Sequence, residues 1–342
     1  MFRISSAPFT GGVPDVKEFY RFPWLPVGPP PTPPVLLTGS HDVSPTASPV
    51  RSASFRERSA LYLCFAGFVG AYYFGALLVG LTPRDQVMST WRGSFLLTCV
   101  LGAGYALFAV MRTLFEMPPS YRELGSRLWK RLWSWETLER VAGVFFLAAG
   151  VNLMFDAFGA FKPAIPDFRP YTLDPLLADL DRALHLGRDP WLWLHAVPGR
   201  DLLTAYLDWA YVRWYDVVMV VLPAVLVAAP LEARIRFFLG YVLLWGVAGS
   251  LLAILLASGG PVYFAELAGD PDRYRPLLAY LDGAAPRARG LQSALWDAFV
   301  RPGENFIFEG ISAMPSLHVG VAAYLSIWAW RAGWWIGALA LL

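Results

Sequence analysis

The residues best suited to chemistry lie in the stretch Ala313–Val319, whose sequence is AMPSLHV. A long apolar run follows it directly, so we expect this stretch to begin a helix. Pro315 suits the first helical position, because the N–H that a proline lacks has no partner there. The backbone N–H groups of Ser316, Leu317 and His318 would then lack intrahelical acceptors and lie at the positive end of the helix dipole. Such an end binds anions, including phosphate.

Two side chains in the same stretch extend this predicted anion site. The hydroxyl of Ser316 adds one donor, and the imidazole of His318 lies within one turn of a bound anion. An imidazole titrates near neutral pH and can protonate the alkoxide that leaves a phosphate. The alternative is a capped helix end without a ligand. The grouping Pro-Ser-x-His at the outward end of a membrane helix favours a functional site over that alternative.

Lys162 and Arg169 form a second candidate group, seven residues apart in a segment stiffened by prolines. The two side chains could hold phosphate oxygens, and a guanidinium would do so through two parallel hydrogen bonds. Alternatively, both are anchors whose stems lie in the apolar layer while their charged heads reach water. The spacing alone favours the anchors.

The composition places these residues in a membrane protein. Of the 342 residues, 56% are hydrophobic and only 16% are charged, whereas a soluble domain has about 25% charged residues. The apolar residues form runs of about 20, the length that crosses a bilayer. The net charge of +2 provides no basic surplus for binding nucleic acid. Two cysteines, Cys64 and Cys99, cannot build a disulfide framework or a metal site, and we expect both to be buried packing residues.

We therefore predict an all-α polytopic membrane helix bundle with six complete spans and a truncated seventh. The sixth span begins at 312–316 and reaches Trp330, and the seventh is cut off at Leu342. The fourth run is the least regular, because Asp208 and two further charged residues lie in its first half. The first five spans are expected near residues 60–81, 94–115, 138–160, 209–231 and 237–257.

Three regions are expected along the chain. Residues 1–55 hold eleven of the 28 prolines and no long apolar period, which predicts a disordered tail. Residues 56–136 carry two spans and a basic cytoplasmic loop, and residues 137–342 form a catalytic domain that is incomplete at its C-terminal end.

The loops rich in Lys and Arg lie on one side of the alternating spans, so this side and the N-terminus are predicted to be cytoplasmic. The long connections 161–208 and 258–312, with the candidate site, then face outward.

From about residue 140 onward, the chain resembles the type 2 phosphatidic acid phosphatase superfamily. The stretch AMPSLHV resembles the second signature of that family, Pro-Ser-Gly-His, and the segment from Lys162 to Pro170 fits the first signature, Lys-x6-Arg-Pro. A leucine in place of the glycine is typical of the branch that resembles inositol phosphorylceramide synthase. The stretches Asp189-Pro190-Trp191 and Gly260-Pro261-Val262-Tyr263 are similar to bacterial members of that branch.

The resemblance implies an enzyme that needs neither a metal nor a cofactor. In that family a histidine attacks the phosphate and forms a covalent phosphohistidine, which splits one difficult displacement into two easier ones. The resemblance assigns phosphate binding to Lys162, Arg169 and Ser316, beside the backbone N–H of Leu317. It assigns the general acid to His318. The cations stabilise the transferring phosphoryl group.

Two departures from the family pattern concern these assignments. No histidine follows His318, so the nucleophilic histidine of the third signature is expected beyond the last residue. Two spans also separate Lys162 from His318, and Arg301, on the same loop as His318, is therefore an alternative cation. His185 and His195 lie in a segment that has the composition of an interfacial amphipathic helix, and a catalytic role for either is the minor alternative.

The leading hypothesis is an integral membrane phosphatase or phosphotransferase at the outer leaflet of a bacterial plasma membrane. Its partners would be membrane lipids and a substrate that is a lipid phosphate, a lipid diphosphate or a phospholipid headgroup. Hydrolysis and transfer to an alcohol both remain open, as do the lipid and the oligomeric state. The alternative is a non-enzymatic transporter or scaffold in which the PSLH helix start is structural. The internal repeat that many transporters show is not found here.

Overall fold

The computed structural model describes residues 55–82, 87–116, 120–301 and 310–333. Throughout these ranges the regular elements are helices. Most of the predicted tail and of the seventh span lies outside the described residues. Within the described ranges, five helices are long and apolar enough to cross a membrane, which confirms an all-α polytopic fold. They are Arg56–Leu78, Phe95–Phe115, Trp135–Phe161, Arg200–Ala228 and Leu231–Leu255.

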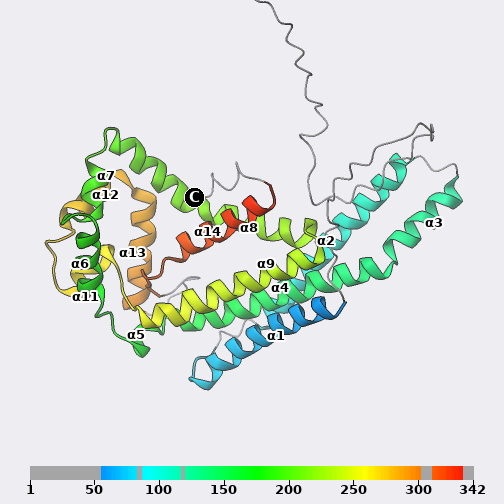
Figure 1. The fold of residues 1–342 in the computed structure, drawn as a ribbon, viewed down its shortest axis with the longest axis horizontal. Helices are drawn as coiled ribbons and strands as arrows, with labels where there is room; N and C mark the ends of the chain where they lie inside the picture. The colour runs from blue at the N-terminus through cyan, green and yellow to red at the C-terminus, as the bar shows by residue number, and fades with distance from the viewer. Residues whose placement is uncertain (1–54, 83–86, 117–119, 302–309, 334–342) are drawn as a thin grey trace, which may run out of the picture. The chain divides into compact units, whose positions relative to one another are not determined.

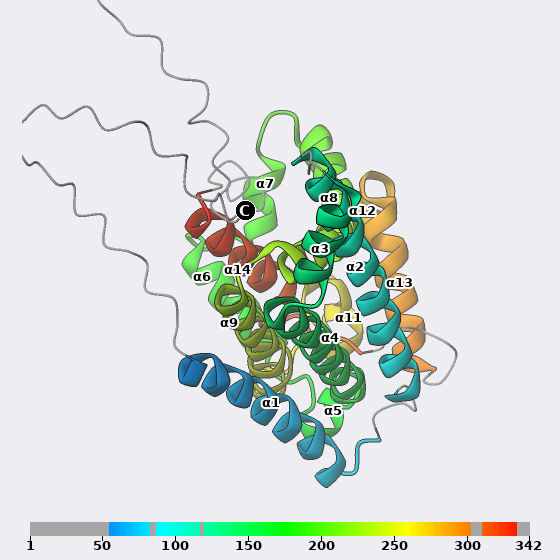
Figure 2. The same ribbon diagram turned by 90° about the vertical axis from the view of Figure 1, so that its right-hand side faces the viewer.

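The main core lies where helices from both halves of the chain meet. Helix α9 continues into a π-helical segment, η2, and a short turn, α10, so that the three together form the fifth span. Figures 1 and 2 show α1, α4 and α9 packed along one another. The side chains of Phe65, Leu147, Tyr241 and Val321 are fully buried between these helices and α14. The bounds are α1 (Phe55–Leu78), α4 (Trp135–Phe161), α9 (Leu231–Leu243), η2 (Leu244–Leu252), α10 (Ala253–Leu255) and α14 (Leu317–Arg331).

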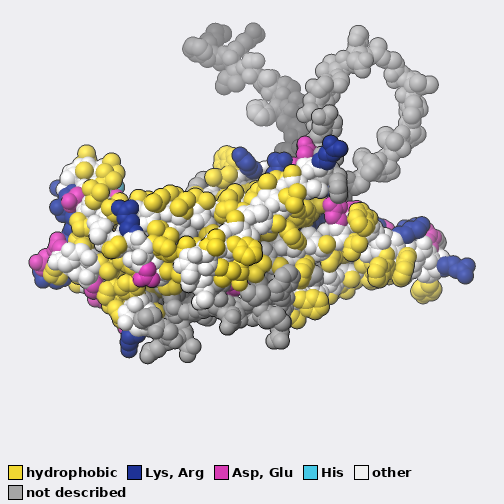
Figure 3. Space-filling model, turned by 90° about the horizontal axis from the view of Figure 1, so that it is seen from below, with side chains coloured by type: hydrophobic (Ala, Val, Ile, Leu, Met, Phe, Trp, Pro, Cys, Tyr) yellow, Lys and Arg dark blue, Asp and Glu magenta, His cyan; other side chains and the backbone are white. Residues whose placement is uncertain are grey.

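The two other N-terminal helices are α2 (Val87–Phe115), which packs on α4, and α3 (Tyr121–Leu132). Helix α3 occupies the predicted basic loop, and its N-cap is Ser120, whose hydroxyl accepts the N–H of Glu123. Hydrophobic side chains cover most of the face of the molecule shown in Figure 3. Exposed apolar surface of this extent suits a protein surrounded by lipid.

The prediction that both cysteines are buried is wrong. Cys64 on α1 and Cys99 on α2 are exposed. The physical reason is that a membrane helix is apolar on its lipid-facing side as well as on its packed side. Membership in an apolar run therefore does not distinguish the two sides.

Helix α8 (Arg200–Ala228) begins well before the predicted start of the fourth span at 209. Its irregular charges have partners. The buried carboxylate of Asp208 accepts the backbone N–H of Ala288 at 2.7 Å and a guanidinium N–H of Arg287 at 3.2 Å. This carboxylate therefore caps the N-terminus of α13 (Pro286–Val300). A charge in the middle of an apolar run thus ties the fourth span to a helix of the last long connection.

The two long connections between the spans fold into short helices, which we call the connecting helices. Figure 1 shows most of them gathered beside the N-terminal half of α8. The nearly buried carboxylate of Asp189 holds them together by accepting N–H groups from Arg182 and Arg273. Besides α13, the connecting helices are α5 (Ile165–Phe168), α6 (Asp174–Leu184), α7 (Pro190–His195), η3 (Pro261–Tyr263), α11 (Phe264–Ala268) and α12 (Arg275–Ala284).

Candidate functional site

The loop that precedes α14 is packed against the end of α4. A Cβ atom on Gly310 would lie 2.6 Å from the backbone carbon and oxygen of Lys162, which is closer than side chains come to backbone. Gly310 also has a φ of +95°, which only glycine adopts without strain. Farther along this loop, the carbonyl of Ile311 accepts the hydroxyl of Tyr171 at 2.7 Å. The structure thus places the loop of the second signature directly on the segment of the first.

A third segment, Ser258–Gly260, supports the same loop from the other side. The carbonyl of Ser258 accepts the N–H of Ala313 at 2.9 Å. The buried carboxylate of Asp174, at the start of α6, accepts the N–H groups of Gly259 at 3.0 Å and Gly260 at 2.7 Å. The two long connections therefore converge at the N-terminus of α14.

The N-terminus of α14 differs in one detail from the prediction. The helix begins at Leu317 and Ser316 is its N-cap, so Pro315 lies before the helix; the Met314–Pro315 peptide bond is cis. The Ser316 hydroxyl oxygen accepts the N–H of Val319 at 3.4 Å. Ser316 is exposed, so its hydroxyl hydrogen remains free to donate. The N–H groups of Leu317 and His318 are the first two of the helix, and neither has an intrahelical acceptor.

The imidazole of His318 packs against two aromatic rings of α8. Its centroid lies 4.7 Å from that of Tyr211, with the rings nearly parallel at 17°, and 4.5 Å from that of Trp214. Among the described residues, none forms a hydrogen bond with either ring nitrogen of His318. The ring is thus fixed in position by its faces, while both nitrogens remain available to a ligand.

Among the described residues, Lys162 is the cation whose charge influences His318. It is the C-cap of α4, and it lies near enough to His318 for its positive charge to disfavour a protonated imidazole. No hydrogen bond or ion pair joins the side-chain ammonium of Lys162 to any residue that the structure describes. The removal of its ammonium from water lowers the pKa of Lys162. A half-buried ammonium without a counter-charge is a favourable partner for a phosphate group.

Arg169, the other cation of the first signature, has a structural contact. Its guanidinium donates to the backbone carbonyl of Leu255 at 2.6 Å, at the C-terminal end of the fifth span. The alternative cation Arg301 pairs with Asp297 at 3.0 Å on its own helix. Neither arginine forms a hydrogen bond with Ser316 or His318. Of these three cations, the structure therefore places Lys162 near enough for its charge to influence His318, while Arg169 and Arg301 have other partners.

The two other histidines in the described part of the chain lie apart from His318. His185 is exposed, and its Nδ1 lies 2.8 Å from the carbonyl of Asp181. His195 packs on the rings of Trp191 and Tyr280 at 5.1 and 4.4 Å. Neither has a hydrogen bond or ring contact with His318.

A comparison with known protein families gives one match, to the PAP2 superfamily, over residues 175–342. This part of the chain is a PAP2 superfamily domain. The matched range includes Ser316, His318 and their aromatic neighbours on α8, and it begins after Lys162 and Arg169. This match over residues 175–342, together with the apolar helices, fits a membrane phosphatase. No curated protein and no solved structure matches the chain.

Several residues that shape the PAP2 domain carry no signal in the sequence. Tyr211 and Trp214 lie in an apolar run more than 100 positions before His318, and no spacing rule connects them with it. Gly310 is one of 30 glycines. Only its positive φ and its contact with Lys162 reveal its importance.

Proposed function

We propose that this protein is an integral membrane phosphatase or phosphotransferase that acts on the phosphate of a lipid through a covalent phosphohistidine, without a metal. The observation that carries the proposal is the close approach of Gly310 to Lys162. This contact holds the Lys162 backbone against the loop that leads into α14, and the Lys162 ammonium, which has no counter-charge among the described residues, is near enough for its charge to influence His318. Cation, free N–H groups and imidazole together match the needs of a transferring phosphoryl group.

The roles follow from this arrangement. Lys162, the hydroxyl of Ser316 and the N–H of Leu317 hold the phosphate oxygens, and Arg169 joins them when it turns from the carbonyl of Leu255. In a phosphohistidine mechanism a histidine attacks phosphorus, forming an N–P bond as the ester P–O bond breaks. His318 gives its proton to the leaving alkoxide. Water or an alcohol then takes the phosphoryl group from the phosphohistidine.

The variant signature and the basic loops support a finer assignment. The leucine in PSLH supports an assignment to the branch that resembles inositol phosphorylceramide synthase, whose reaction is headgroup transfer. The basic side chains around α3 favour a cytoplasmic position for that helix and for the N-terminus. The site at the start of α14 then faces the outer leaflet of a bacterial plasma membrane.

The test measures phosphate release and headgroup transfer by the full-length protein in lipid nanodiscs with EDTA. The substrates are phosphatidic acid, a prenyl diphosphate and phosphatidylinositol, each with and without an added alcohol acceptor. We expect turnover in EDTA that falls at least about 100-fold in His318→Ala, which is the usual effect of removing a general acid. His185→Ala, a histidine exposed on a connecting helix, is the matched control and should keep wild-type turnover.

Three results would contradict the proposal. Unchanged turnover in His318→Ala removes this residue from the mechanism, and loss of wild-type turnover in EDTA contradicts a metal-free reaction. Failure to trap a ³²P-labelled protein that is stable in alkali and labile in acid excludes a phosphohistidine.

A further inference from the structure

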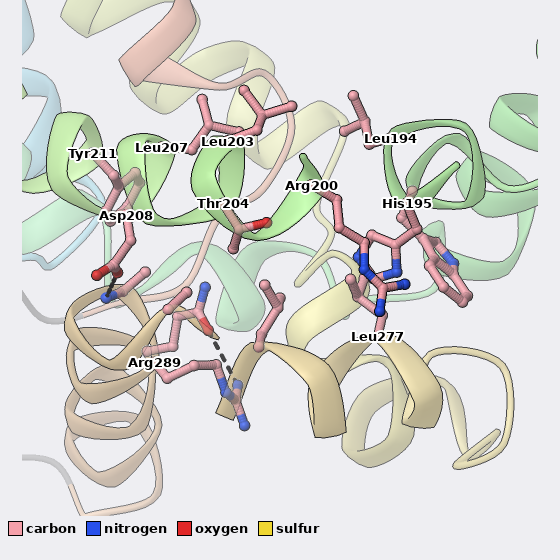
Figure 4. A pocket seen from close by; sticks show the side chains of 15 residues that line it. Leu194, His195, Arg200, Leu203, Thr204, Leu207, Asp208, Tyr211, Leu277 and Arg289 are labelled. Atoms are coloured by element: carbon pink, nitrogen blue, oxygen red, sulfur yellow. Dashed lines mark hydrogen bonds between the residues drawn. The ribbon is translucent and has the colours of Figure 1, made fainter. Parts of the chain in front are cut away.

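A cavity of about 240 Å³ lies between α7, α8, α12 and α13, outside the phosphate site. Figure 4 shows Tyr211 and Asp208 at one end of this cavity and His195 at the other. Tyr211 is the residue whose ring stacks on His318 at 4.7 Å. One aromatic ring therefore separates the cavity from the proposed general acid.

Several of the polar side chains that line the cavity are already paired. A ligand rich in hydroxyl groups would have to break these bonds or leave its own groups unpaired, at a free-energy cost in either case. The remaining wall is largely apolar: it includes Leu203, Leu207, Leu277 and Leu281, while His195 and Arg200 lie at one end. The interior therefore favours a hydrocarbon over a sugar or polyol. The paired groups are Asp208 with Ala288 N–H (2.7 Å), Arg289 with Gln292 (3.1 Å) and Thr204 with Tyr280 (3.1 Å).

The rim of the cavity is continuous with apolar surface that faces away from the protein. Leu194 and Leu207 line the cavity and are also 52% and 48% exposed. Leu202 and Tyr206, on the same end of α8, are exposed as well. Helix α8 has 29 residues and is about 43 Å long, longer than the roughly 30 Å hydrocarbon layer. Its charged N-terminal end therefore lies at the bilayer surface, where a lipid chain can reach the cavity from the side.

We infer that this cavity binds the hydrocarbon chain of the alcohol that leaves the phosphate. The inference rests on the proposed function, because His318 must protonate the oxygen that carries this chain. The chain lies along Leu203, Leu207 and Tyr211, which follow one another on one face of α8 at intervals of four residues. Tyr211 forms the boundary between the chain and the reacting phosphate.

The first test measures how kcat/KM depends on the chain length of monomeric alkyl phosphates, whose chains start in water. Each methylene buried in the wild-type cavity should raise kcat/KM by up to about fourfold, until the cavity is full. Leu203→Trp and Leu281→Trp fill the cavity from opposite walls and should abolish most of this rise. Leu202→Trp, on the neighbouring exposed position, should keep the wild-type dependence.

The second test does not depend on turnover. A decyl phosphate that carries a diazirine at the chain end is cross-linked to the protein in nanodiscs, and the labelled peptides are mapped by mass spectrometry. We expect label on α8 and α12 near Leu203 and Leu281, reduced at least about tenfold in Leu281→Trp and unchanged in Leu202→Trp. Label in the cavity without turnover of any lipid phosphate supports the binding site and contradicts the proposed function. Turnover with the wild-type chain-length dependence in both filling variants, or label confined to other helices, overturns the inference.

Discussion

A single methyl group at Gly310 should uncouple the two halves of the PAP2 site. The Cβ atom of Gly310→Ala would lie 2.6 Å from the backbone of Lys162, whereas ordinary contact begins at 3.4 Å, so the two segments must separate by about 0.8 Å. A misplacement of about 1 Å in a catalytic group can cost about 100-fold in rate. The φ of +95° adds strain of about 1–2 kcal/mol for alanine. We therefore expect kcat to fall about 100-fold.

Gly269→Ala is the matched control. Gly269 has a φ of +74°, and no atom lies within 4 Å of the position of its Cβ. This variant carries the same kind of backbone strain, about 1–2 kcal/mol, without the collision. The assay is steady-state release of phosphate from phosphatidic acid in nanodiscs, with thermal unfolding measured in parallel. We expect Gly310→Ala to lose more stability than Gly269→Ala, because it alone adds a collision to the strain, and only Gly310→Ala to lose activity. If Gly310→Ala keeps kcat within about threefold, or Gly269→Ala loses as much activity, the contact with Lys162 does not position the site.

Three further predictions follow from the same contacts. Desolvation lowers the pKa of Lys162 in the folded protein, so the unfolded state binds the ammonium proton more tightly. The free energy of unfolding must therefore rise as the pH increases from the lowered pKa toward the ordinary value of about 10.4. Over this pH range the melting temperature of the wild type should therefore rise relative to that of Lys162→Met, and saturating inorganic phosphate should remove this relative rise. If the melting temperatures of the two proteins change with pH in parallel, the ammonium of Lys162 is not desolvated. Asp208→Ala removes the cap of α13 and should cost about 1 kcal/mol in unfolding free energy, with Asp208→Asn losing less; equal losses would contradict the capping role. The topology is tested by labelling with a membrane-impermeant maleimide in a background without Cys64 and Cys99. A cysteine that replaces Ser126 on α3 should react only in opened cells, and one that replaces Asp282 on α12 should react in intact cells. The reverse pattern would invert the proposed topology.

The membrane spans are the part of the fold that was most readily predictable. A span must present about 20 apolar residues to lipid wherever it packs, so its signal is contained in a continuous run. The start of α8 was less predictable, because Asp208 interrupts the run and its partner, the N-terminus of α13, is 80 positions away. The exposure of Cys64 and Cys99 was not predictable from hydropathy, since lipid and protein interior are both apolar.

The candidate site also has a part that the sequence predicts and a part that only the tertiary structure shows. The sequence by itself determined a helix that starts with Ser316 and His318 and the cations that could serve it, because capping and anion binding at a helix end depend on neighbouring residues. Only the tertiary structure decided that Lys162 acts on His318 while Arg169 caps the fifth span, and that Tyr211 and Trp214 hold the imidazole. These contacts join segments far apart in the chain. Their geometry depends on how the spans pack and on one glycine that lets two loops touch, and neither property is encoded in a local pattern of residue types.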